Sequence, residues 1–173
     1  MANKFNKRYR IASVRASWWE YTTPGAYFIT ICTYQKYPYF GKPTNVSPIG
    51  QIATTCWHDI PHHHTVPITL GAFVVMPNHI HGLIGLGGNR FVVVEPQPAA
   101  ALRLRQPHQP HLRIPANSIP AIIRGYKSTV TKLAHREGFN FRWHSRYYDH
   151  IVRDDAAYDR ITLYILTNPQ RLV

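Results

Sequence analysis

Two apolar, β-branched runs, residues 68–75 and 79–86, flank the short segment Met76-Pro77-Asn78. Such runs are typical of strands, and proline with asparagine between them indicates a turn. We therefore predict an antiparallel hairpin. Its second strand begins His79-Ile80-His81. Because strand side chains alternate between faces, both imidazoles should point the same way, roughly 7 Å apart at Cβ, while Ile80 points into a core.

The two histidines allow two interpretations. Neutral imidazoles on one strand face can share a metal ion. A strand with two partly exposed histidines needs no ligand, and the triplet alone does not decide between these alternatives. A second cluster, His62-His63-His64, is predicted to be solvated at a helix end, because consecutive residues point in different directions and cannot easily bind one ion together.

The charge of the chain limits its partners. Lysine and arginine total 20 against 8 acidic residues, which gives a formal net charge of +12. This surplus indicates a polyanionic partner, most simply nucleic acid. No apolar run approaches the length of about 20 residues that spans a bilayer, and the N-terminus lacks a signal-peptide core, so no membrane partner is expected. The cysteines Cys32 and Cys56 lie in apolar settings and lack CxxC spacing, so they are predicted to be buried free thiols in a reducing cytoplasm.

The length of 173 residues suits one domain with a real core. Residues 1–22 mix basic and aromatic side chains and are interpreted as a basic N-terminal arm. Residues 95–117 are rich in proline and are interpreted as an insertion without an assigned fold. We therefore predict a single domain over 1–173 with these two appendages.

The remaining patterns predict a mixed α+β fold. A strand is expected over 26–34 and a helix over 49–62, ended or distorted by Pro61. After the hairpin, Ser118 is a natural N-cap and Gly138 a natural stop for a second helix. Residues 141–152 end in strand character, and a last helix starts at Asp154 or Asp155. This order best fits a ferredoxin-like (RRM-like) antiparallel sheet with helices packed on one face.

Two segments carry candidate DNA contacts. The flank of the helix after Ser118 presents hydrogen-bond donors suited to phosphate oxygens, namely Arg124, Lys127, Ser128 and Thr131. A solvated polar face is the alternative, and the basic net charge favours DNA. In the second segment basic residues alternate with aromatic ones, a pattern that can pair phosphates and stack bases. Its members are Arg142, Trp143, Arg146, Tyr147, Tyr148 and Arg153.

The last predicted helix carries Tyr164 and Asn168 four residues apart, so they are neighbours on one helical face. Ala157 and Ile161 lie on the same stripe, which indicates that this face turns toward the sheet. Tyr164 could then meet a metal ion held by His79 and His81, and Asn168 could add an oxygen ligand. The alternative is a core tyrosine and a helix C-cap before Pro169.

Five segments together resemble the single-tyrosine HUH transposases, in which two histidines flank a hydrophobic residue, and most closely the REP-associated tyrosine transposases. They are PGAYFITICTYQ at 24–35, FVVMPNHIHGLI at 73–84, SIPAIIRGYKSTVTK at 118–132, WHSRYYDHIVRDD at 143–155 and YILTNP at 164–169. The resemblance implies the HUH endonuclease fold, His79 and His81 as metal ligands and Tyr164 as nucleophile. It places Asn168 where insertion-sequence relatives carry a glutamine ligand.

The resemblance also implies a reaction. Tyr164 would cleave single-stranded or hairpin DNA through a 5′-phosphotyrosine intermediate and rejoin it, aided by Mg²⁺ or Mn²⁺. Tyr147 and Tyr148 are rival nucleophiles, but neither is followed by a ligand-type residue four positions later. A monomer is favoured over a dimer, in the cytoplasm and associated with the nucleoid.

Two other functions stay open at this point. One is a non-catalytic nucleic-acid-binding protein of the same fold, with His79 and His81 as bystanders. The other is a rolling-circle replication initiator, which often carries a tyrosine pair on its active-site helix, whereas here position 168 is asparagine. The distance between the Tyr164 hydroxyl and the two histidines discriminates the enzyme from the binding module.

Overall fold

A computed structural model describes residues 4–5, 8–9, 20–88 and 114–172 of the chain. Most of the predicted basic arm and the proline-rich insertion up to residue 113 lie outside these residues. Within the arm, β1 (Lys4–Phe5) pairs with β2 (Arg8–Tyr9). No helix among the described residues is long and apolar enough to cross a membrane. Cys32 and Cys56 are free thiols, as predicted, but only Cys56 is buried, because Cys32 at the end of its strand is half-exposed.

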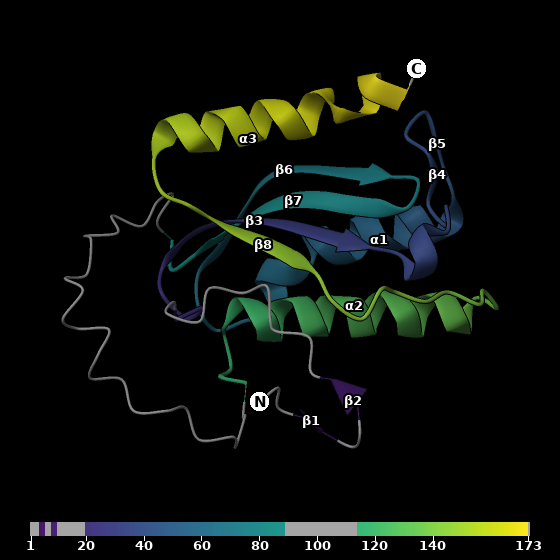
Figure 1. Ribbon diagram of the computed structural model, residues 1–173, viewed down its shortest axis with the longest axis horizontal. Coiled ribbons are helices and arrows are strands. Elements are labelled where there is room, and N and C mark those ends of the chain that lie inside the picture. Colours follow the sequence, from purple (N-terminus) through teal and green to yellow (C-terminus); the bar gives the residue numbers. More distant parts are fainter. Residues whose placement is uncertain (1–3, 6–7, 10–19, 89–113, 173) are drawn as a thin grey trace.

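The centre of the molecule is a four-stranded antiparallel sheet (Figure 1). Its strands are β3 (Gly25–Cys32), β6 (Ile68–Met76), β7 (His79–Leu86) and β8 (Tyr148–Val152). They lie in the order β6-β7-β3-β8, and β6 and β7 form the predicted hairpin around Pro77-Asn78. The α+β class and the ferredoxin-like strand order are therefore confirmed.

Two helices cover one face of this sheet. They are α1 (Pro48–His58) and α2 (Ile119–Arg136), and each begins at a serine N-cap whose side chain accepts a backbone N–H bond, Ser47 for α1 and Ser118 for α2. Between them and the sheet lies the main core, whose largest members are Trp57, Tyr27, Phe40, Phe141, Ile29, Ile31, Ile80, Ile84, Ile119 and Ile122. The helix predicted over 49–62 ends at His58, and Pro61 lies in the 3-10 turn η2 (Ile60–His63).

The third helix, α3 (Asp155–Thr167), lies on the opposite face of the sheet (Figure 1). The prediction that helices pack on one face holds for α1 and α2 and is wrong for α3. The reason is that β3 and β7 are apolar on both faces: Ala26 and Leu83 form a second buried cluster with Ile165 of α3. A strand buried on both sides needs a covering layer on each.

The helix after Ser118 stops as predicted, since Gly138 has a φ of +83°, a conformation that glycine adopts without strain. The last helix ends near Asn168, as predicted, just before Pro169. Asn168 is the C-cap of α3, and η4 (Asn168–Leu172) follows it directly. Short segments complete the described chain: η1 (Tyr34–Lys36), β4 (Gly41–Lys42) and β5 (Asn45–Val46).

One close contact holds β7, the strand that carries His79 and His81, on its face toward α1. Gly82 of β7 lies directly under the buried indole of Trp57, and any Cβ there would collide with the ring. The indole is itself stacked on Phe73 of β6, with ring centroids 4.9 Å apart. The backbone next to His81 therefore rests on a rigid aromatic pair.

Candidate active site around His79, His81 and Tyr164

His79 and His81 point to the same face of the sheet, as strand alternation predicted. Their Nε2 atoms are 3.1 Å apart, and the two rings meet at 72°. Metal–imidazole bonds are about 2.0 to 2.1 Å long, so both nitrogens can contact one ion at this separation. The donor set therefore fits a metal ion that accepts nitrogen ligands.

Each imidazole is held by a hydrogen bond at its other nitrogen. His79 Nδ1 donates to Asn78 Oδ1 at 2.7 Å, since an amide oxygen only accepts. This leaves the lone pair of His79 on Nε2. His81 Nδ1 lies 2.8 Å from Thr30 Oγ1, on the strand next to β7, where Thr30 is directly opposite His81 in the register. Such outer partners fix ring orientation in metal sites.

The surroundings keep both imidazoles neutral. Burial lowers the pKa of His81 to about 4, and the neighbouring His79 adds to this effect. Burial also lowers the pKa of His79, with a further contribution from the positive charge of Lys36. Neutral imidazole is the form that binds metal, so at neutral pH both side chains are in the ligand form.

Tyr164 of α3 reaches this pair. Its hydroxyl lies 3.4 Å from His81 Nε2, and its ring meets the His81 ring at 63° with centroids 5.3 Å apart. Phe28 of β3 stacks on His81 and meets the Tyr164 ring edge-on. Tyr164 is 38% exposed, so the residue is open to solvent on part of its surface. The Tyr164 hydroxyl therefore does approach the two histidines, which is the condition that the enzyme interpretation requires.

Asn168 occupies the end of the same helix. It is 8% exposed and keeps right-handed helical geometry, one turn after Tyr164. The hydrogen bonds and ring contacts described above link Tyr164 to His81 and do not include Asn168. Among the described residues no group of three His, Cys, Asp or Glu side chains converges to hold a metal. A third protein ligand beside the two histidines would thus have to be of another type, such as this amide.

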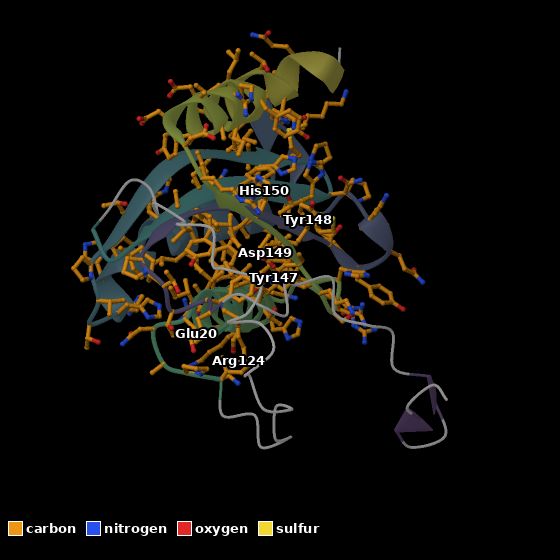
Figure 2. All side chains as sticks on the ribbon, turned by 60° about the vertical axis from the view of Figure 1, so that its left-hand side comes forward. Glu20, Arg124, Tyr147, Tyr148, Asp149 and His150 are labelled. Carbon is orange, nitrogen blue, oxygen red and sulfur yellow. The ribbon has the colours of Figure 1, made fainter. Side chains whose placement is uncertain are left out.

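The rival tyrosines lie on different faces. Tyr147 packs against the core on the α2 side. Tyr148 is directly opposite Thr30, which is itself opposite His81, so it shares the histidine face at a distance of about two strand spacings, roughly 10 Å. Figure 2 shows this alternation, with Tyr148 and His150 nearer α3 and Tyr147 and Asp149 nearer α2. Tyr148 is therefore the rival to test.

The predicted contacts on α2 lie on the opposite face from the histidines. A groove of about 580 Å³ runs between α2 and residues 141–145, and Lys127 and Thr131 are among its lining residues. The Lys127 ammonium donates to the backbone carbonyls of His144 and Ser145, and Thr131 donates to the Lys127 carbonyl. Both side chains thus have internal partners.

Arg124 is exposed on the same helix, below Tyr147 in Figure 2. Both residues line a second cavity of about 230 Å³. Arg142, Arg146 and Arg153 are also exposed, on the segment that leads into β8 and just after it. Thr33 and Trp143 form an isolated antiparallel β-bridge, and the Trp143 ring packs against the core. Of the aromatic residues in this segment that were predicted to stack on bases, only Tyr148 is classed as exposed. Trp143 and Tyr147 are half-buried and pack against the core on the α2 side, and their role in base stacking stays a prediction.

Comparison with known proteins adds to this geometry. An uncharacterized protein of Haemophilus influenzae is 33% identical over 175 residues, covering 98% of this chain and 94% of the relative. The chain belongs to the same family as that protein. A solved REP-associated tyrosine transposase bound to a REP hairpin is 16% identical and superposes with a TM-score of 0.60, over 94% of this chain and 74% of that one.

The chain has the fold of the REP-associated tyrosine transposases. No protein-family model matches it. Within the transposase fold, sequence analysis missed the residues that support the site: Thr30, Asn78, Phe28 and Lys36. Asn78 could have been found, because it directly precedes His79 and its amide oxygen can accept a hydrogen bond from an imidazole N–H. The other three depend on strand register or on a turn, which no local pattern reveals.

Proposed function

We propose that this protein cleaves and rejoins single-stranded DNA at hairpin-forming sequences, with Tyr164 as the nucleophile. The observation that carries the proposal is the 3.4 Å approach of the Tyr164 hydroxyl to His81, whose Nε2 is 3.1 Å from that of His79. A nucleophile beside two neutral, hydrogen-bonded imidazoles is an arrangement that supports phosphodiester transfer. The transposase fold and the basic net charge support the same function.

In the proposed reaction the Tyr164 oxygen bonds to the scissile phosphorus as the bond from phosphorus to the 3′ oxygen breaks. The proton lost by tyrosine is balanced by the proton that the released 3′-OH gains. The product is a 5′-phosphotyrosine, and attack by a 3′-OH reverses the step and joins strands. No net hydrolysis occurs, so rejoining needs no nucleotide cofactor.

His79 and His81, with Asn168 as the proposed third ligand, would hold Mg²⁺ or Mn²⁺. When bound, the ion supplies charge stabilisation at the phosphate in the transition state. The chain itself does the positioning. Thr30 and Asn78 orient the imidazoles, and Phe28 supports the rings of His81 and Tyr164.

The DNA would be held by the exposed arginines Arg124, Arg142, Arg146 and Arg153, with Lys127 and Thr131 shaping the α2 groove. We further propose that the protein works as a monomer in the cytoplasm, associated with the nucleoid. A non-catalytic binding module is disfavoured because a binding surface has no need for a tyrosine hydroxyl at hydrogen-bonding range of a histidine pair. A rolling-circle initiator is disfavoured because Tyr164 has no second tyrosine one turn later.

The test is a covalent-adduct assay. The full-length protein is incubated with labelled single-stranded DNA that contains a palindrome and a single-stranded flank, with Mn²⁺ or with EDTA. A labelled band that survives denaturation, appears only with the metal and is lost in Tyr164→Phe supports the proposal. Tight binding of the same DNA with no adduct and no cut strand under any metal condition would leave a binding module as the function.

A further inference from the structure

The turn that follows β3 is attached to the histidine hairpin. Cys32, the last residue of β3, lies opposite His79 in the register. The next residue, Thr33, is buried; its backbone N–H donates to the carbonyl of Asn78 at 2.9 Å, and its hydroxyl lies 3.0 Å from the same oxygen. Asn78 is also the residue that orients His79. The turn and the metal-ligand candidates are therefore parts of one hydrogen-bonded unit.

The backbone of this turn is unusual. Gln35 and Lys36 have φ values of 50° and 55°, in the left-handed region that residues with a side chain rarely adopt. The conformation is closed by three bonds within the turn: Lys36 N–H to the Thr33 carbonyl, Tyr37 N–H to the Tyr34 carbonyl and Thr33 Oγ1 to the Tyr37 carbonyl. Backbone strain of this kind gathers at sites that must present side chains in fixed directions.

The turn presents aromatic rings and positive charge to solvent. Tyr37 is 61% exposed and Tyr34 is 40% exposed. Tyr37 leans on Tyr39, which packs edge-on against the buried Phe141, so the ring is supported from below. The Arg142 guanidinium lies 4.9 Å above the Tyr34 ring. The core does not use these exposed ring surfaces.

Lys36 adds a cation beside the site. It is exposed, and its positive charge adds to the effect of burial in lowering the pKa of His79, which lies opposite Cys32 in the sheet. This cation near His79 has no acidic partner among the described ion pairs, where Arg136–Glu137 is the pair found. Its electrostatic effect makes this corner attractive to an anion.

We propose that this turn is a platform for single-stranded DNA, on which Tyr34 and Tyr37 stack unpaired bases while Lys36 and Arg142 contact the adjoining phosphates. The inference rests on the proposed function for its biological meaning, since it brings the strand to the corner next to His79. Unpaired bases are selected because a duplex hides its base faces inside the stack, whereas exposed tyrosine rings bind such faces with little regard to sequence. RNA offers the same faces and is treated below as a competing outcome.

The test measures binding without catalysis. All proteins carry Tyr164→Phe and are studied in EDTA, so that neither the nucleophile nor a metal contributes. One probe is a labelled strand of about 20 thymidines, longer than the roughly 4 to 16 nucleotides that a single-strand-binding domain covers. The second is a mixed-sequence duplex of equal length, and the third is the corresponding uridine strand. Fluorescence anisotropy gives each dissociation constant at one fixed salt concentration.

Replacing both rings, Tyr34→Ala with Tyr37→Ala, should weaken thymidine-strand binding about tenfold or more and leave duplex binding within about twofold. The matched control, Tyr34→Phe with Tyr37→Phe, keeps both rings and should bind like the parent. Lys36→Gln should weaken strand binding by a smaller factor and lower its salt dependence by about one ion. Unchanged thermal unfolding midpoints exclude a folding defect.

The outcomes separate the inference from the function on which it rests. The platform is refuted if the double alanine variant binds the thymidine strand like the parent, if it loses duplex affinity equally, or if the parent prefers the uridine strand. These results do not depend on covalent chemistry. If the alanine variant loses strand binding while the natural Tyr164 protein never forms an adduct, the platform stands and the proposed transposition chemistry fails.

Discussion

The two faces of the sheet differ in what they expose. The face covered by α1 and α2 holds the large core, and the cations along α2 sit above it, where the Lys127 ammonium is bonded to backbone carbonyls. The face toward α3 has a small buried cluster and carries His79, His81 and Tyr164 next to open strand surface. The large hydrophobic core and the candidate active site thus lie on opposite faces of the same strands.

β3 and β7 therefore contribute side chains to the core on one face and to the candidate site on the other. Odd-numbered residues of β3, such as Ile29 and Ile31, are buried in the main core, whereas Thr30 between them holds His81. The chemical face can change by single substitutions without disturbing the core, because neighbouring residues on a strand point to opposite sides. The predictions below use that separation, and the largest effect comes first.

Tyr164→Phe removes the hydroxyl that lies 3.4 Å from His81 and keeps the ring packed on Phe28. We expect adduct formation to fall by roughly 10³-fold or more, with DNA affinity and stability almost unchanged. The matched control is Tyr148→Phe, on the same sheet face but two strands away from His81, which should retain the adduct. An adduct that persists in Tyr164→Phe and maps to Tyr148 would show that Tyr148 of β8 is the nucleophile.

His79→Ala removes one of the two converging nitrogens. His79 is only half-buried and lies at the start of β7, so the protein should stay folded. Loss of a residue that only hydrogen-bonds to a metal ligand typically lowers activity about 10- to 100-fold. Because His79 is proposed to bind the metal itself, metal-dependent cleavage should fall by more than this. The measurement is cleavage rate against Mn²⁺ concentration, with His150→Ala as a control on the same face. Wild-type cleavage in His79→Ala would show that the pair is not a metal site.

Thr30→Val tests a positioning residue rather than a ligand. It replaces the hydroxyl that lies 2.8 Å from His81 Nδ1 with a methyl group of similar size. Mn²⁺ affinity should weaken about tenfold, whereas binding of DNA in EDTA should not change. Thr30→Ser keeps the hydroxyl and should restore metal affinity. If the valine and serine variants have equal Mn²⁺ affinity, Thr30 acts through packing alone.

The smallest effects are expected on the α2 side, where two basic residues should behave differently. Arg124→Ala should weaken DNA binding modestly, lower the salt dependence of affinity by about one ion and leave hairpin choice and unfolding temperature unchanged. Lys127→Met should instead lower the free energy of unfolding by about 1 kcal/mol, because its ammonium joins α2 to residues 144 and 145. Salt-dependent anisotropy and thermal denaturation measure the two effects. Equal loss of DNA affinity with no loss of stability in both variants would contradict this distinction.

Local periodicity was enough to predict much of the fold and part of the site. Strand alternation placed both histidines on one face, and helical spacing turned Tyr164 toward the sheet. It could not say which face α3 covers, because β3 and β7 are apolar on both sides. Thr30 was hidden for a different reason: its partner His81 is 51 residues away, and only the strand register joins them.

The position of Lys127 shows the same limit. Its place on a basic helix face predicted a phosphate contact, but the segment that captures its ammonium lies 17 and 18 residues further along the chain. Free surface charge and internally bonded charge look alike in a sequence. They differ only in whether a distant segment of the folded chain supplies hydrogen-bond partners for the charged group.

The contact between Gly82 and the Trp57 indole bears on how relatives should be sought. A search pattern built on His-x-His alone would accept any residue at the next position. Here that residue lies against a buried ring, so a side chain of any size would push β7 away from α1 and shift His81 with it. A sequence with both histidines but a bulky residue after them would need a smaller residue in place of the tryptophan, and the paired occurrence of the two changes is what a search should require.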